Sequence, residues 1–519
     1  MATRYPGSGN KPILTAGQML FSGMNSTLKA SRIGDDECAL MQNMERTFTG
    51  TLRTRDGARQ LSVPGDRHIQ GMGYYDVFGQ ESVFGVRNGV VYRTDYDSVY
   101  ENFYPFGTVA GAPTMDTDSR VEFRQLIAAL YAIDGTNLYK YDGTNWSTVV
   151  GAPAGVQVIH TDDSRVFLAK TDSEPDAIWV SDTGDGETYT TPQNKTRIGG
   201  GDGDEIMAMA PGEGFVVVVL KRNSIYLVNT DPIVDVANWQ RQRISFGVGL
   251  VAARAWCKAG DDIYFLAEDG VRTVGRVAGQ ERSGVNLPLS IQVQGIIEKI
   301  NKAQRHKVSM CYTQNRVLIA VPLENSEEPN YVLVFNTLTQ RWAGYWTANP
   351  NGSETTWRPR CWINTYIGGV ERVLYGQASG DVWHFLDGRN IHQDGSDWIH
   401  WQCLSKAFNF AQELNQKQGA FVEFEFRNSM GAVTIYAVLD GDLTNKRQIY
   451  SGTTSDGVAA LGQSLPLKLG GSSRRIKCPL GHVGRFREIQ FLIEGSGTAD
   501  FVNLREIAAG AWMGALNLT

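Results

Sequence analysis

The chain repeats one simple pattern, in which a short apolar, strand-forming run is followed by a polar turn and a second such run. The repeats recur at a spacing of about 35 to 60 residues, the range typical of propeller blades and other repeat architectures. A unit of this kind can bury its apolar run only against a neighbouring unit. The chain is therefore predicted to be all-β, with an irregular β-propeller of about seven blades.

The turns carry the clearest local signal. Asn88-Gly89 separates two apolar runs, and Asn-Gly in that position strongly favours a two-residue hairpin. Two similar turns begin at Asp134 and Asp142. Seven units have this form. Their paired runs are residues 82–86 with 90–92, two runs within 125–146, 165–169 with 177–180, 215–220 with 225–228, 262–266 with 271–274, 316–321 with 331–335, and 372–376 with 381–385.

Residue types also differ within each pair. The first run is small and aliphatic, whereas the second ends in an aromatic residue. Strands near a propeller axis are crowded and outer strands have room for bulk. We therefore expect the first run of each pair to lie nearer the axis. The 57 glycines, 20 tyrosines and 21 phenylalanines agree with many short strands joined by tight turns.

One segment departs from the strand pattern. Ile291, Ile296, Ile297 and Ile300 lie near helical spacing, and Ser290 precedes them in the position of an N-cap. We predict a short helix near 290–304, inserted between two blades.

Differences in the pattern of apolar and polar residues divide the chain into three parts. Residues 1–65 contain no blade-like unit and predict an extended N-terminal arm, an assembly segment that gains structure by lying on a neighbour; one helical turn is expected around 35–44. Residues 66–390 form the propeller. Residues 391–519 contain longer strands, and strict alternation of apolar and polar residues at 420–427 predicts a sandwich-like C-terminal domain.

Charge and cysteine usage exclude several classes of protein. The net charge is −6, with both signs interspersed, which argues against a broad basic face that grips nucleic acid. The six cysteines are widely spaced without a C-x-x-C pair, so we expect isolated buried thiols; disulfides are the alternative. We find no signal peptide and no apolar run long enough for a membrane anchor. Synthesis in a reducing cytoplasm is the simplest interpretation.

Motifs of catalysis and cofactor binding are missing from the sequence: it has no phosphate-binding loop, no complete dinucleotide fingerprint and no nucleophile elbow. We predict no catalytic residue, no cofactor and no metal, and hence no enzyme. Two acidic turns, residues 181–187 and 199–205, are rich in oxygen ligands as calcium sites are, but lack the full spacing of such a loop. Plain propeller turns are the simpler interpretation.

Three histidines recur at eight-residue spacing among tryptophans: His384, His392 and His400. Imidazole binds zinc and aromatic rings stack on sugars, so a metal or sugar site is one interpretation and packing at a domain junction is the other. Basic residues cluster at Arg53, Arg55 and Arg59 and again at Arg474, Arg475, Lys477, Arg485 and Arg487. Because the planar guanidinium suits pairing with carboxylates, we expect these clusters to face solvent or a partner chain.

The N-terminal stretch resembles the tail nozzle proteins of short-tailed bacteriophages, also called tail tubular protein B or packaged-DNA stabilization proteins. The likeness rests on Gly23-Met24-Asn25, Asp36-Glu37, Asn43 and residues 50–57, which include Arg53, Arg55 and Gly57. Pro288-Leu289-Ser290 before the predicted helix and Gly484-Arg485-Phe486 are also similar to that family.

The resemblance implies a virion protein of the phage tail, made in the cytoplasm of a bacterial host. It implies a homo-hexameric ring below the portal and adaptor, contacts to a tail fibre or tailspike, in some relatives a needle or plug, and DNA that passes through the channel without sequence-specific binding. Assembly contacts would then fall on Gly23, Asn25, Asn43, Arg53, Arg55, Gly57, Arg474, Arg475 and Arg485. The alternatives are a propeller that binds or hydrolyses glycans, with an aromatic platform or carboxylate pair at one mouth, and a β-rich scaffold of an unrelated particle.

Overall fold

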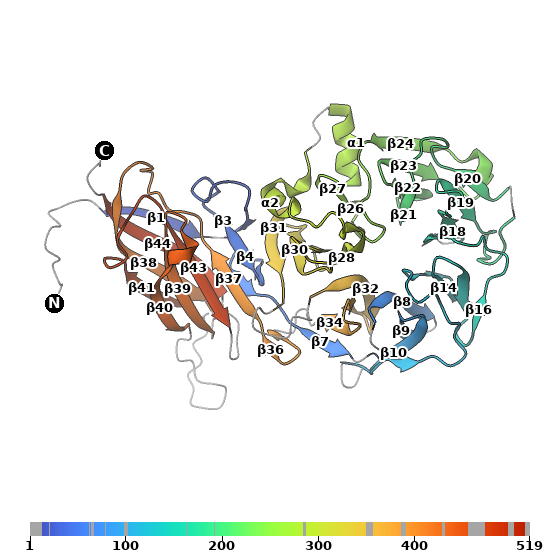
Figure 1. Cartoon of the computed structure of the whole chain (residues 1–519), viewed down its shortest axis with the longest axis horizontal. Coiled ribbons are helices and arrows are strands. Elements are labelled where there is room, and N and C mark those ends of the chain that lie inside the picture. The colour runs from blue at the N-terminus through green and yellow to red at the C-terminus, as the bar shows by residue number, and fades with distance from the viewer. Residues whose placement is uncertain are drawn as a thin grey trace. The chain divides into compact units, whose positions relative to one another are not determined.

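The computed structural model describes residues 13–19, 21–61, 63, 67–77, 79–97, 102–162, 164–190, 193–283, 287–348, 357–385, 391–427, 431–454, 473–496 and 503–513. The chain divides into two compact units. The first unit comprises residues 1–57, 334–354 and 387–519, and the second comprises 58–333 and 355–386. Figure 1 shows that strands dominate both units.

The second unit is a β-propeller, as predicted. Five sheets lie wholly within it, and together with the four strands that it supplies to a sixth sheet they form six blades. Their strands are β8 (Ile69–Val77), β9 (Gln80–Arg87), β10 (Val90–Asp97), β11 (Asn102–Phe103) and β12 (Gly107–Thr108); β13 (Glu122–Leu126), β14 (Ala129–Ile133), β15 (Leu138–Tyr141) and β16 (Trp146–Thr148); β17 (Val158–Thr161), β18 (Val166–Ala169), β19 (Ala177–Val180) and β20 (Lys195–Arg197); β21 (Ile206–Pro211), β22 (Val216–Lys221), β23 (Ser224–Asn229) and β24 (Arg241–Phe246); β25 (Trp256–Ala259), β26 (Asp262–Ala267) and β27 (Gly270–Thr273); and β32 (Pro359–Ile367), β33 (Val370–Gln377), β34 (Val382–Phe385) and β7 (Ala58–Leu61).

A further hairpin lies between the last two of these sheets. Its strands are β28 (Ser309–Thr313) and β29 (Arg316–Val321), and β28 contacts both β25 and β32. The hairpin thus occupies the position of an additional blade. The next strand, β30 (Tyr331–Asn336), contains the point at which the chain passes between the two units.

The last blade is completed by a strand from much earlier in the chain. β7 pairs antiparallel with β34, with Gln60 opposite Trp383 and Leu61 opposite Val382. Pairing this strand, which precedes the first blade in the chain, with the last sheet closes the ring of blades.

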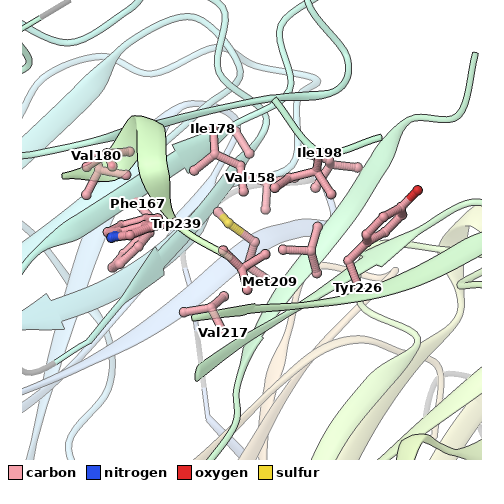
Figure 2. Close-up of a cluster of buried hydrophobic side chains, with 14 residues drawn as sticks. Val158, Phe167, Ile178, Val180, Ile198, Met209, Val217, Tyr226 and Trp239 are labelled. Carbon is pink, nitrogen blue, oxygen red and sulfur yellow. The ribbon is translucent and has the colours of Figure 1, made fainter. Parts of the chain in front are cut away.

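Apolar side chains fill the spaces between successive blades. Figure 2 shows one such cluster, in which Phe167 and Ile178 of one blade pack with Met209 and Val217 of the next. The side chain of Trp239 stacks on Phe167 with 5.9 Å between ring centroids. Similar clusters lie between the first and second, the second and third, and the last and first blades.

The hairpin turns follow the sequence prediction. Asn88 and Gly89 both have positive φ, 51° and 72°, as the two-residue turn between β9 and β10 requires. The Asp134 carboxylate accepts hydrogen bonds from the backbone N–H groups of Thr136 and Asn137. In the next turn, Asp142 accepts likewise from those of Thr144 and Asn145.

One local prediction was wrong and two features were missed. In each blade the paired runs are the second and third strands, so the first run does lie nearer the axis, but a further strand precedes them, such as β13, which has no continuous apolar run. The predicted helix is a 3-10 turn, Leu289–Val293, followed by α2 (Gln294–Ile297); Ser290 is not its N-cap, because its hydroxyl accepts from the Val271 N–H. A longer helix, α1 (Val274–Ser283), was not predicted.

The first unit contains two larger sheets that form the sandwich-like domain. One sheet contains β1 (Ile13–Met19), β5 (Met44–Arg46), β6 (Leu52–Thr54), β38 (Lys417–Arg427), β41 (Ser473–Pro479), β42 (Arg485–Phe486) and β44 (Asn503–Met513). The other contains β4 (Leu40–Gln42), β31 (Arg341–Trp346), β37 (His400–Leu404), β39 (Ala432–Leu439), β40 (Arg447–Thr453) and β43 (Ile489–Ser496). Phe424 and Phe491 meet edge to face between the sheets, 5.6 Å apart.

Most of the described part of the N-terminal arm therefore belongs to this unit, whereas residues 58–61 form β7 of the propeller. β1 pairs with β44 over seven residues, and β2 (Gly23–Met24) pairs with β3 (Glu37–Cys38). Its neighbour is its own chain, and residues 35–44 form short strands, not a helical turn. The domain boundaries expected at 65 and 390 fall near the observed unit boundaries, after residue 57 and before residue 387. The inclusion of residues 334–354 in the first unit was not predicted. No helix among the described residues has the length and apolar character needed to cross a membrane.

Candidate functional sites

Residues singled out by their N-terminal pattern converge on a buried polar network in the first unit. The Arg55 side chain is fully buried, and its two terminal nitrogens donate to the two carboxylate oxygens of Asp394 at 3.0 and 2.6 Å. Its Nε donates to Asn43 Oδ1 at 3.0 Å. His392 Nδ1 lies 2.8 Å from the Arg55 carbonyl oxygen.

Asn43 joins three stretches of chain. It has a positive φ of 53° and is completely buried. Its side-chain oxygen accepts from Arg55 and from the Thr347 N–H, and its Nδ2 donates to the His400 carbonyl at 2.7 Å. Asparagine tolerates this left-handed backbone better than most residues, and its amide offers both a donor and an acceptor.

A second part of the network surrounds Asn25. Asn25 Nδ2 donates to Glu37 Oε2 at 2.9 Å, and the other oxygen of Glu37 lies 3.2 Å from Arg341 Nη1. The Asn25 oxygen accepts from the N–H groups of Thr27 and Leu28 and so shapes the following turn.

Two glycines of the pattern, Gly23 and Gly57, are required by close backbone approach. A Cβ atom at Gly57 would lie 1.8 Å from the Gln393 carbonyl oxygen, and one at Gly23 would lie 2.5 Å from that of Trp342. Neither distance is possible for a side chain, so glycine is the only residue that fits without moving the backbone.

The predicted assembly residues therefore divide into two groups. Gly23, Asn25, Asn43, Arg55 and Gly57 are buried within the chain, so the expectation that Arg55 faces solvent or a partner was wrong. Arg53 pairs with Glu45 on the adjacent strand. Arg474, Arg475 and Arg485 lie on β41 and β42: Arg474 donates to the Thr453 carbonyl, Arg475 pairs with Glu423 and Glu425, and Arg485 is exposed.

Other candidates from the sequence are occupied by the chain's own hydrogen bonds. Asp202 accepts from Lys221 Nζ through both oxygens at 2.8 Å, and Asp204 accepts from Asn223 and Ser224. In the other acidic turn, Asp185 accepts from Glu187 and Thr188. Among the described residues no group of three His, Cys, Asp or Glu could hold a metal ion.

The three histidines do not form one cluster. His384 belongs to the propeller and packs on Phe103 at 5.1 Å, whereas His392 and His400 belong to the first unit. His392 contacts the Arg55 carbonyl and His400 offers its own carbonyl to Asn43. The packing interpretation fits these contacts.

The propeller also contains a cavity, which the sequence did not predict. Its volume is about 780 Å³, and it lies where the first strands of the blades meet. β8, β13, β17, β21, β25, β28 and β32 contribute Met72, Phe123, His160, Pro211, Trp256, Tyr312 and Trp362, respectively. The cavity therefore lies on the propeller axis, enclosed by these first strands.

The cavity has a buried end and an open end. Val121, Ser309 and Cys361, at or near the starts of their strands, are buried. Residues that line the cavity near the ends of the strands are exposed: Pro211, Lys258, Gln314, Asn364 and Tyr366. The cavity is thus an axial well whose mouth lies where the first strands end.

Arg254 lies at the buried end of this axial well. Its Nη2 donates to the carbonyls of Gln70 and Val121 at 2.6 and 2.7 Å, and Nη1 lies 3.4 Å from that of Arg360. One guanidinium thereby ties together three neighbouring parts of the ring. Burial lowers its pKa, which nevertheless belongs to a group that stays protonated in proteins.

Comparisons with known proteins give no family for the chain. No family model and no curated protein matches it. A solved structure described as "AfRom2 CNH domain" is similar in part, with 10% sequence identity and a TM-score of 0.39, over 64% of this chain and 98% of that chain. A similarity at this level carries no inference about function.

Proposed function

We propose that this protein is a structural component of a short-tailed phage tail, a hexameric nozzle ring below the portal and adaptor through which genomic DNA is retained and then ejected. The observation that supports the proposal is the convergence of the resemblance residues. Gly23, Asn25, Glu37, Asn43, Arg55 and Gly57 are spread over 35 positions of sequence, yet each is buried in a role that its residue type alone fills well. A chance likeness in surface turns would not be expected to select such residues.

Charge is compatible with this role. The net charge of −6 per chain means that a ring of protomers would repel a polyanion weakly overall, which favours passage of DNA over retention by contact. Because the pattern residues hold the first unit together, we assign assembly contacts to exposed groups instead. Arg485 on β42 is the first candidate, since it is exposed on a sheet of that unit.

Native mass spectrometry and negative-stain microscopy of the purified chain, alone and with a portal–adaptor complex, test the proposal. We expect a ring of six, formed by the chain alone or on the adaptor. Arg485→Glu should weaken ring formation without changing thermal unfolding, whereas Lys299→Glu, an exposed lysine of the propeller unit, should leave the ring intact. A chain that stays monomeric under both conditions would contradict the nozzle function.

A further inference from the structure

The axial well combines three kinds of chemistry that a structural blade junction does not need. Its buried end holds the Arg254 guanidinium, its wall carries aromatic rings, and its mouth carries amides and a lysine. A volume of about 780 Å³ lies within the range of ligand pockets.

Arg254 is a cation without a carboxylate partner. Its hydrogen bonds all go to backbone carbonyls, and within the described residues no Asp or Glu lies at ion-pair distance from it. Arg254 is partly buried, and a charge taken out of water is costly to the extent that no opposite charge joins it. The cavity side of the guanidinium is where an anionic group could enter.

The remaining charges of the well favour an anion. Arg124 and Lys258 add two cations to Arg254. Of the two carboxylates in the lining, Glu122 already pairs with Arg120 at 2.9 Å, and Glu371 accepts a hydrogen bond from Asn364. His160 adds no charge, because burial lowers its pKa to about 3.

The wall of the well is organised before any ligand enters. Trp362 Nε1 donates to Ser309 Oγ at 3.0 Å, and that hydroxyl lies 3.1 Å from the Pro359 carbonyl. Asn364 Nδ2 donates to the Tyr312 carbonyl at 2.8 Å. Indole and phenol rings offer flat faces to the C–H surface of a ring, and amides pair with hydroxyl groups.

We propose that the axial well binds a saccharide whose terminal unit carries a carboxylate, with the carboxylate toward Arg254 and the sugar ring against the aromatic wall. The positive charge of the guanidinium attracts a carboxylate, and this selects an acidic sugar over a neutral one. This inference does not rest on the nozzle function, since a single propeller contains the whole well.

Isothermal titration calorimetry on the full chain tests this inference. The probes are tetrasaccharides ending in glucuronic acid or in sialic acid, the neutral tetrasaccharide of N-acetylglucosamine, and a dT4 oligonucleotide. We expect at least one acidic saccharide to bind ten or more times as tightly as the neutral one. Binding by neither acidic probe, equal binding of the neutral probe, or tighter binding of dT4 would each overturn the proposal.

Variants localise the binding. Arg254→Gln should lower the affinity for the acidic probe at least tenfold, but this change could also disturb the three strands that Arg254 joins. Tyr366→Ala and Lys258→Gln, at the exposed mouth, should each weaken binding severalfold with unchanged thermal unfolding. The matched controls are Tyr104→Ala and Lys299→Gln, which replace exposed residues outside the well. Mouth variants that bind like these controls would place the ligand elsewhere and refute the assignment.

Discussion

The Arg55 guanidinium and the Asp394 carboxylate form two hydrogen bonds although 339 residues separate them in the sequence. Both side chains are buried, at 0% and 5% exposure. The pair joins the N-terminal segment to the C-terminal strands of the same unit, and Asn43 and His392 hold the Arg55 residue from two further sides. Integrity of the first unit should therefore depend on this contact.

Arg55→Met tests that dependence. The substitution keeps an unbranched side chain but leaves the Asp394 carboxylate buried and without its bidentate partner. Loss of one member of a buried ion pair costs about 3–5 kcal/mol, so the first unit should unfold at a clearly lower denaturant concentration. Arg475→Met is the control, because 62% of that side chain is exposed and its ion pairs should contribute less than about 1 kcal/mol. Equal effects of the two substitutions would contradict the structural role of Arg55.

Local chemistry made part of this fold predictable. The Asn88-Gly89 turn and the Asp134 and Asp142 turns involve residues adjacent in sequence, so their residue types already report their backbone geometry. The alternation at 420–427 likewise predicted Val422, Phe424 and Phe426 as one buried face.

The features that the sequence did not predict are a strand with polar residues and contacts between residues far apart in the sequence. β13, the first strand of its blade, has Glu122 and Arg124 in the lining of the axial well and has no apolar run to reveal it. The partner of Arg55 could not be found by spacing, since only the folded chain brings residue 394 to it. For the same reason, nothing in the sequence marked Arg254 as the residue at the buried end of the axial well.

Phe167 should be a key residue of the propeller core. It is 1% exposed, stacks on Trp239 and packs between two blades. Phe167→Ala should destabilise the propeller by about 3–5 kcal/mol, measured by the shift of its unfolding transition in urea. Phe215→Ala in the next blade replaces a side chain that is 62% exposed and should change stability by less than about 0.5 kcal/mol. A small effect at Phe167 would argue against the packing of these blades.

The acidic turn at residues 199–205 should make stability depend on pH. Burial would raise the pKa of Asp202, but hydrogen bonds from Lys221 and from the Asp204 N–H outweigh it and lower that pKa. Because the folded-state pKa is lower than the unfolded one, the contribution of Asp202 is complete well above pH 4 and is lost as pH falls through the folded pKa. Asp202→Asn should therefore be less stable than the wild type at pH 7, with a gap that narrows below about pH 4.

The exposed Asp261 provides the control for that experiment, since Asp261→Asn should follow the wild-type stability from pH 7 to pH 3. Urea unfolding at each pH gives the two differences. A gap between Asp202→Asn and the wild type that stays constant down to pH 3 would show that the carboxylate charge does not stabilise the turn.

The six cysteines should react slowly with a thiol reagent in the folded protein. All are buried and free, and Cys38 and Cys403 lie with their sulfur atoms 3.4 Å apart. Burial raises the pKa of Cys311 to about 12 and that of Cys478 to about 11, so the reactive thiolate is scarce at pH 8. Titration with a chromogenic disulfide at pH 8 should detect six thiols only after unfolding. Rapid modification of the native chain, or fewer than six thiols in denaturant, would contradict this expectation.

Closure of the propeller by β7 changes what a truncation should do. If residues 1–65 were only an assembly arm, as the sequence predicts, their removal would leave the propeller folded. In the structure that deletion also removes β7, whose Leu61 is 4% exposed and belongs to the cluster between the last and first blades. A chain beginning at Ala58 keeps the strand, whereas a chain beginning at Asp66 lacks it.

Hydrogen exchange of the β34 amides distinguishes these two truncated chains. Both lack the strands that residues 13–57 supply to the first unit, so differences in the propeller arise from residues 58–65, which contain β7 and the buried Val63. We expect protection of Val382 to Phe385 to fall sharply in the chain that begins at Asp66, because the ladder between β34 and β7 is gone. Thermal unfolding of its propeller should also occur several degrees lower. Equal protection of β34 in the two chains would mean that the ring of blades holds together without the strand from the N-terminal side.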